Sequence, residues 1–169
     1  MKHFKNVLAA AALLVLGAST QAATELTPEQ SLELRKAVIT WLECEECTDG
    51  ELERLLKYGE AAVPTLAAVL DRGASPASLE KYRLHLESSY RNLVEYSRTH
   101  DEVKIEQGED EYVKQYLENY QAHYAVRSAQ ALAKLGGAGA RRSLEAASQR
   151  KMREDVNRVI QDSLKALGR

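Results

Sequence analysis

The sequence predicts an all-α protein, and three observations support this prediction. Only 3 prolines and 9 glycines occur among 169 residues, and most of them stand where helices would begin or end. Residues with high helix propensity, chiefly Ala, Leu, Glu, Arg and Gln, are abundant. Apolar side chains recur every three or four residues, whereas no segment has the strict alternation or the β-branched enrichment typical of a strand.

Residues 1–22 have the pattern of a secretory signal peptide. Lys2 and Lys5 give a positive start, and the apolar run 7–16 is far too short to span a bilayer. Small residues follow, with Thr20 and Ala22 at the positions that a signal peptidase reads. We therefore predict export to the periplasm or the medium, cleavage after residue 22, and one helical domain over 23–169. An uncleaved membrane anchor is the alternative, and no transmembrane segment is expected after cleavage.

Capping signals place the first three helices of the mature chain. The segment Thr27-Pro28-Glu29-Gln30 is a capping box with proline at the first helical position, which predicts a helix over 28–43. A second capping box, 48–51, opens a short helix that ends near Tyr58. A third helix is expected over about 62–71, with Gly73 as its stop.

Two long helices and two shorter ones follow. Apolar and tyrosine residues step by three or four over 76–99 and again over 111–135, which predicts two long helices. The charged segment 101–110 breaks the pattern and is expected to connect them into a hairpin. Shorter helices are predicted over 140–150 and 153–167.

Several of these segments resemble HEAT repeats. The segment 59–70 (GEAAVPTLAAVL) resembles the first helix of a repeat, including its proline, and 126–136 (VRSAQALAKLG) resembles the second helix with its closing Leu-Gly. The Leu-Gly recurs after 32 residues, and 143–147 between them resembles another first helix. The resemblance covers about half of the mature chain. It implies stacked antiparallel helices, a HEAT-like α-α superhelix with a long inserted hairpin, and a role in protein binding.

Charge is distributed unevenly along the chain. Without Lys2 and Lys5, 21 basic and 25 acidic residues remain, and this acidic balance argues against a nucleic-acid partner. Residues 23–126 hold 11 basic and 21 acidic residues, whereas residues 127–169 hold 10 basic and 4 acidic ones. The two parts are expected to attract each other or to face different partners.

Cys44 and Cys47 are the only cysteines and have the spacing of a disulfide, a redox pair or part of a metal site. Six acidic residues surround them, and no Lys or Arg occurs between Thr40 and Arg54. Because negative charge disfavours thiolates, a structural disulfide is the favoured interpretation. Redox chemistry and metal binding remain the alternatives.

A tyrosine repeats at every fourth position of the second long helix, at Tyr112, Tyr116, Tyr120 and Tyr124. Such spacing places them along one slowly rotating face. This face is either an aromatic binding surface or, as we expect, a seam packed against the tyrosines of the preceding helix.

No catalytic residue, cofactor or metal ligand set is predicted. The chain has no phosphate-binding loop, no serine elbow and no zinc motif, and His85, His100 and His123 lie on scattered segments. The sequence therefore predicts an exported, non-catalytic protein-binding or structural module whose partner is another protein. The alternatives are a small periplasmic thiol-disulfide protein that uses Cys44 and Cys47, and a metal-handling protein.

Overall fold

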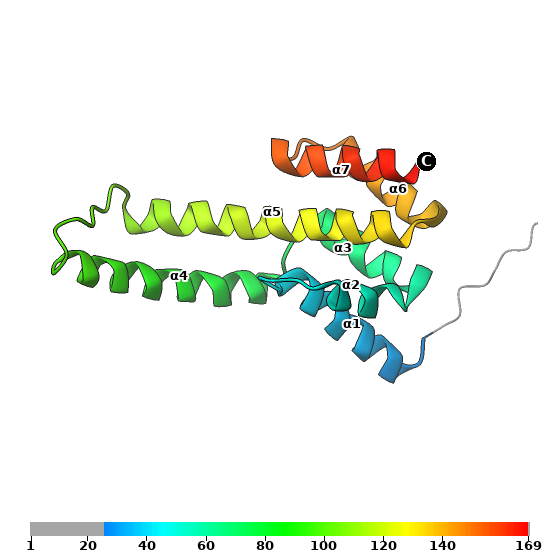
Figure 1. Cartoon of the computed structure of the whole chain (residues 1–169), viewed down its shortest axis with the longest axis horizontal. Helices are drawn as coiled ribbons and strands as arrows, with labels where there is room; N and C mark the ends of the chain where they lie inside the picture. Colours follow the sequence, from blue (N-terminus) through cyan, green and yellow to red (C-terminus); the bar gives the residue numbers. More distant parts are fainter. Residues whose placement is uncertain (1–25, 169) are drawn as a thin grey trace, which may run out of the picture.

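The computed structural model describes residues 26–168, in which seven α-helices and one 3₁₀ helix pack together (Figure 1). In chain order they are α1 (Pro28–Glu43), α2 (Asp49–Leu56), η1 (Gly59–Ala62), α3 (Val63–Arg72), α4 (Pro76–Ser97), α5 (Glu109–Leu135), α6 (Gly137–Ser148) and α7 (Glu154–Leu167). No strand occurs between residues 26 and 168, so the all-α prediction is confirmed. The predicted signal peptide, residues 1–22, lies outside the described residues.

Both predicted capping boxes are present. At α1, the Thr27 hydroxyl accepts a hydrogen bond from the Gln30 backbone (3.2 Å), and the Gln30 side chain accepts one from the Thr27 backbone (2.9 Å). At α2, the Glu51 carboxylate accepts hydrogen bonds from the Thr48 backbone (2.9 Å) and the Thr48 hydroxyl, and the Glu51 backbone donates to the Thr48 carbonyl (3.3 Å). These bonds satisfy backbone N–H groups that have no partner within the helix, and so they fix where each helix begins.

The core lies around the C-terminal half of α5. Its alanines, among them Ala125, Ala129 and Ala131, are buried, and their small side chains let α3 and α7 pack closely against it. Large aliphatic side chains from the surrounding helices fill the remaining space, namely Leu42, Leu55, Leu66, Leu70, Leu144, Val156 and Ile160. This arrangement makes α5 the element on which the rest of the fold is built.

The first turns of α5, before Asn119, lie outside this core, and α4 is the helix that runs beside them (Figure 1). The two helices run antiparallel as a hairpin that extends away from the other helices (Figure 1). Tyr82 of α4 stacks on Tyr120 of α5 with ring centres 4.4 Å apart, and Tyr90 meets Tyr112 at 5.4 Å. The predicted long hairpin is therefore present, and its outer part extends beyond the other described helices (Figure 1).

Two helix starts differ from the sequence prediction. α5 begins at Glu109, two residues early, because the acidic residues 109–111 interact favourably with the positive end of the helix dipole. α6 begins at Gly137, where the sequence suggested only a stop. Gly136 and Gly137 adopt φ angles of 71° and 79°, which allow the chain to turn directly from α5 into α6.

No helix in residues 26–168 combines the length and the apolar character that crossing a bilayer requires.

Candidate functional site: a groove beside the helical hairpin

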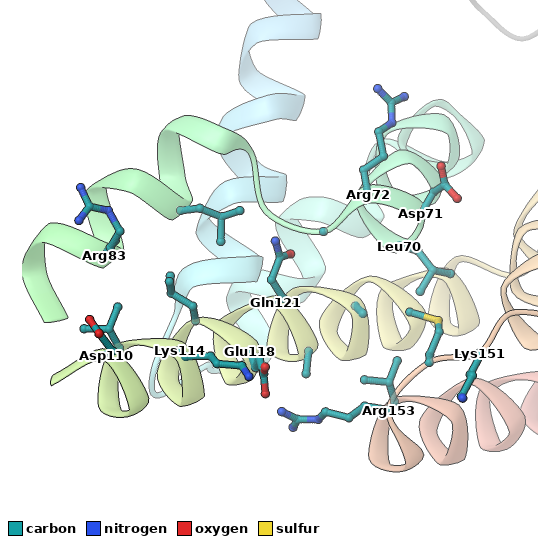
Figure 2. A pocket seen from close by; sticks show the side chains of 18 of the residues that line it. Leu70, Asp71, Arg72, Arg83, Asp110, Lys114, Glu118, Gln121, Lys151 and Arg153 are labelled. Atoms are coloured by element: carbon teal, nitrogen blue, oxygen red, sulfur yellow. The ribbon is translucent and has the colours of Figure 1, made fainter. Parts of the chain in front are cut away.

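A broad groove of about 1060 Å³ runs along one face of the α4–α5 hairpin and ends at the loop between α6 and α7 (Figure 2). We call it the hairpin groove. Its floor is apolar and is built by side chains from five segments, namely Leu70 of α3, Leu79 of α4, Val113 and Leu117 of α5, Met152 of the α6–α7 loop, and Val156 of α7. Leu117 lies on this floor and is only half-buried, so an apolar partner could cover it.

One wall of the groove is a short linker between α3 and α4, and it is held rigidly. Gly73 ends α3 with φ 74° and ψ −154°, a backbone conformation that is essentially limited to glycine. The next backbone N–H, that of Ala74, donates to Gln121 Oε1 of α5 at 2.9 Å. Ser75 then caps α4, accepting from the Ser78 backbone at 3.1 Å, and Pro76 occupies the first turn. Gln121 thus ties the linker to the floor of the groove.

Charged residues line the rim, and their sign changes along the groove. At the tip end, toward the free end of the hairpin, Glu87, Glu109 and Asp110 are acidic. At the base end, near the core, Arg72, Lys151 and Arg153 are basic, and the acidic Asp71 beside them is paired with Arg150. Figure 2 places Asp110 at one end of the groove and Lys151 at the other, while the Arg153 side chain extends back toward Glu118.

Some of these charged side chains form ion pairs within the protein, whereas others form none in residues 26–168. Arg83 bonds Glu80 at 2.7 Å and also Glu87, which reduces the charge of Glu87. Arg153 pairs with Asp155 and donates to Asn119 at 2.7 Å, and the Arg153 side chain lowers the pKa of Asp155 to about 2. Within residues 26–168, Arg72 and Lys151 form no ion pair. The base end therefore keeps free positive charge.

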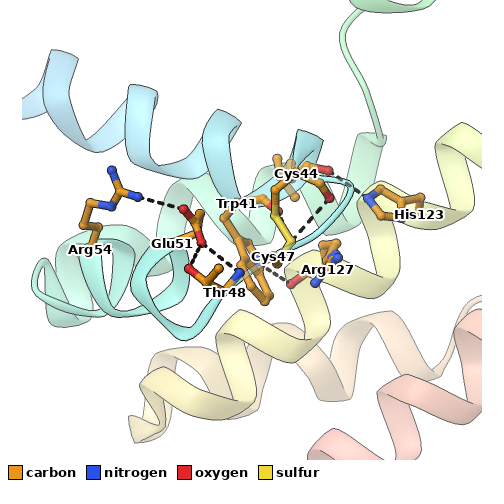
Figure 3. The surroundings of a disulfide bond; sticks show 9 residues. Trp41, Cys44, Cys47, Thr48, Glu51, Arg54, His123 and Arg127 are labelled. Carbon is orange, nitrogen blue, oxygen red and sulfur yellow. Dashed lines mark hydrogen bonds and ion pairs between the residues drawn. A yellow bond between two sulfur atoms is a disulfide. The ribbon is translucent and has the colours of Figure 1, made fainter.

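Cys44 and Cys47 lie at disulfide distance, with their Cα atoms 5.3 Å apart, in the loop that joins α1 to α2 (Figure 3). Cys44 is the C-terminal cap of α1, and Cys47 precedes Thr48, the N-cap of α2. A bond between them fixes the angle at which the second helix leaves the first. This is the position that the structural interpretation of the pair requires.

The disulfide loop is anchored to α5 by residues that are far away in the sequence. Trp41 Nε1 donates to the Arg127 carbonyl at 3.0 Å, and the Arg127 guanidinium lies 4.7 Å from the centre of the Trp41 ring. His123 Nε2 donates to the Leu42 carbonyl at 2.9 Å, and burial lowers the pKa of its imidazole. The sequence shows only acidic neighbours, but the fold also brings a histidine and an arginine close to the pair (Figure 3).

The four tyrosines of α5 do not form one open surface. Tyr112 and Tyr120 pack against α4, as expected for a seam, whereas Tyr116 keeps 39% of its surface exposed. Tyr124 is only 5% exposed and donates to Glu43 Oε1 at 2.7 Å, and burial raises its pKa. The reason is geometric, because a step of four residues turns about 40° around a helix. The three steps from Tyr112 to Tyr124 therefore turn by about 120°, so that Tyr112 lies in the hairpin and Tyr124 lies in the core.

A smaller cavity of about 630 Å³ lies on the opposite face of the hairpin, beside the disulfide loop. Cys44, Tyr82, His85, Tyr120 and His123 contribute to its lining. In residues 26–168 no three His, Cys, Asp or Glu side chains come together as a metal site would require.

No protein-family model matches this chain, and the comparisons with curated proteins and with solved structures found no match either.

The hairpin groove is not evident from the amino-acid sequence. Val113 and Leu117 are recognisable as the aliphatic residues between the tyrosines of α5. Their partners, however, come from segments 34 to 43 residues away in the sequence, such as Leu79 and Val156. No local spacing pattern connects such residues, so the groove emerges only from the packing of α3, α5 and α7.

Proposed function

We propose that the mature protein is an exported, non-catalytic module that binds another protein through the hairpin groove. The observation that carries the proposal is the combination of an apolar floor with a charged rim on an uncovered face of two long helices. This pairing of an apolar centre with a polar border is how protein interfaces are organised. The signal-peptide pattern of residues 1–22 supports the export part, with the periplasm as the expected compartment.

The size and chemistry of the groove favour a protein segment over a small molecule. At about 1060 Å³ it is at the upper end of the range for small-molecule sites, about 300–1,000 Å³. It is an open trough along two helices, and such a trough suits an amphipathic segment. The rim carries both signs of charge, which does not suit the uniformly negative backbone of a nucleic acid.

A HEAT-like scaffold is part of the same proposal. It is supported by helices that pack in pairs, with α1 against α2 and α6 against α7. In this interpretation the hairpin of α4 and α5 is an insertion that supplies the binding face. The fold-level analogy favours a binding role, while the groove itself supplies the specific argument.

Affinity capture with a pair of matched variants tests the proposal. Leu117→Glu places a charge on the groove floor, whereas Ile39→Glu makes the same kind of change at a 53% exposed position of α1 outside the groove. Wild-type protein and Ile39→Glu should capture the same periplasmic partner, and Leu117→Glu should lose it. Circular dichroism confirms folding, and Leu117→Ala serves as a milder variant. Equal capture by all four proteins would refute the groove as the binding site.

Export is tested separately by intact-mass analysis of the protein from a periplasmic fraction. The expected mass lacks residues 1–22, because Thr20 and Ala22 occupy the peptidase positions. A mass that retains Met1 to Ala22 would refute the signal-peptide interpretation.

A thiol-disulfide protein is the second candidate, favoured by one observation. Cys44 is half-buried and lines a cavity that His85 and His123 also line, so two imidazoles share a cavity with one cysteine of the pair. A disulfide-exchange assay tests this candidate. Activity that is lost in Cys44→Ser but kept in Leu117→Glu would favour it over the binding module.

A further inference from the structure

We propose that the occupant of the hairpin groove is an amphipathic helix with opposite charges at its two ends. Its basic N-terminal end lies at the tip of the hairpin, and its acidic C-terminal end lies at the α6–α7 loop. This inference rests on the proposed function and adds the chemistry and direction of the partner segment. It follows from the shape of the floor, the order of charges on the rim, and the direction of a helix dipole.

The floor fits one apolar stripe of a helix. Along α5 the groove extends from Glu109 to Ala125. At 1.5 Å per residue this distance is about 24 Å, or a little over four helical turns. The aliphatic floor residues lie along this length, as the stripe of a bound amphipathic helix would. A segment of about 15 residues would therefore cover the groove from end to end.

The rim determines which charges the occupant carries. The tip end presents Glu109 and Asp110, and the base end presents Arg72 and Lys151, which form no ion pair within residues 26–168. A helix with a single sign of charge would be repelled at one of the two ends. A helix with basic residues at one end and acidic residues at the other would be attracted at both.

The dipole of the occupant then selects its direction. The N-terminus of a helix carries a partial positive charge and its C-terminus a partial negative charge. The attraction between the rim and the dipole is therefore greatest when the N-terminus of the occupant approaches Glu109 and Asp110, and its C-terminus approaches Lys151. The basic N-terminal and acidic C-terminal residues of this occupant oppose its own dipole, so their attraction to the rim must exceed that unfavourable interaction. Between the ends, Lys114 and Glu118 add both signs within one turn of α5 and favour neither direction.

Two synthetic peptides of about 15 residues test the inference, with identical composition and the same apolar stripe. The first has lysines in its N-terminal half and glutamates in its C-terminal half, and the second alternates them. By fluorescence anisotropy at low salt, the mature protein should bind the first about tenfold more tightly. The difference should shrink as salt screens the rim. Equal affinities, or no binding of the first peptide, would overturn the inference.

Cross-linking and charge reversal test the direction. A benzophenone group near the N-terminus of the first peptide should label the start of α5, and one near its C-terminus should label residues 151–153. Lys151→Glu should weaken binding of the first peptide about fivefold, in line with the loss of an exposed charge pair and the gain of a repulsion. Arg142→Glu, the same reversal at an exposed site outside the groove, should leave it unchanged. Reversed labelling would overturn the proposed direction.

The outcome separates this inference from the proposed function. If capture of the natural partner depends on Leu117 but neither peptide binds, the groove remains the binding site and only the charge-ordered helix is wrong. If capture is independent of Leu117, the proposed function itself fails.

Discussion

Replacing Gly73 by alanine is expected to destabilise the fold by about 3 kcal/mol, because two separate costs combine at this position. The first is backbone strain, since φ 74° with ψ −154° is a region that residues with a Cβ atom rarely enter, at a cost of about 1–3 kcal/mol. The second is steric. An added Cβ would overlap Gln121 Oε1 and lie 2.9 Å from its Cδ, so the amide must move and release the Ala74 N–H. Loss of that partly buried hydrogen bond costs about 1 kcal/mol or more.

Urea unfolding of Gly73→Ala measures the total, and Gly50→Ala is the matched control. Gly50 lies in the first turn of α2 with an ordinary φ, and its added Cβ would meet only Thr48 Oγ1 at 3.4 Å. Because alanine has the higher helix propensity, Gly50→Ala should be neutral or stabilise by up to about 1 kcal/mol. In a double variant, Gln121→Ala should remove the steric cost but leave the backbone strain. A Gly73→Ala protein within about 0.5 kcal/mol of wild type would refute this account of the linker.

Three further predictions concern the rest of the fold. Replacing both Cys44 and Cys47 by serine should lower the free energy of unfolding by about 2 kcal/mol, the chain-entropy contribution of so short a loop. Alkylation of the denatured, unreduced wild-type protein should detect no free thiol. Two reactive thiols would contradict the disulfide. Tyr120→Ala should lower the free energy of unfolding by about 2 kcal/mol, because the ring stacks on α4. Tyr116→Ala, at a 39% exposed position, should lower it by less than about 1 kcal/mol. Equilibrium unfolding measures both, and equal losses would contradict the different burial of the two rings. Asp155→Asn should lower the free energy of unfolding by at most about 1 kcal/mol at neutral pH, since the site is exposed. Because folding lowers the pKa of Asp155 from 3.8 to about 2, the stabilisation by its carboxylate is present above pH 3.8 and is lost as the pH falls through 2. A stability difference between the two proteins that persists below pH 2 would contradict this assignment.

Local signals in the sequence predict most helix boundaries of this fold. The capping box at Thr27 and proline at the next position determine the start of α1, and both act within one helical turn. Gly73 and Gly136 end α3 and α5 in the same local way, through positive φ angles. The start of α6 differs from the prediction because two successive glycines indicate the end of a helix, whereas their positive φ angles also allow a second helix to begin at once.

The site depends on contacts between distant residues, and these are not encoded in local spacing. Tyr124 reaches Glu43 across 81 residues, and this contact buries one end of a stripe that the sequence presents as a uniform face. Likewise, Arg127 lies over Trp41 although it is 86 residues away, so the surroundings of the disulfide are less acidic than the sequence suggests. Periodicity identifies which residues share a helix face, but only packing decides which face is covered.

The central claim, that the hairpin groove binds a protein, is tested most directly by site-directed photo-cross-linking in intact cells. A photoreactive amino acid at Leu117 should give a discrete higher-mass product with a single partner protein, and Lys151→Glu in the same chain should weaken that product. The same amino acid at Ile39, an exposed apolar position outside the groove, should give none. A product of equal yield from Ile39, or no product from Leu117 while the protein is folded and exported, would contradict the claim.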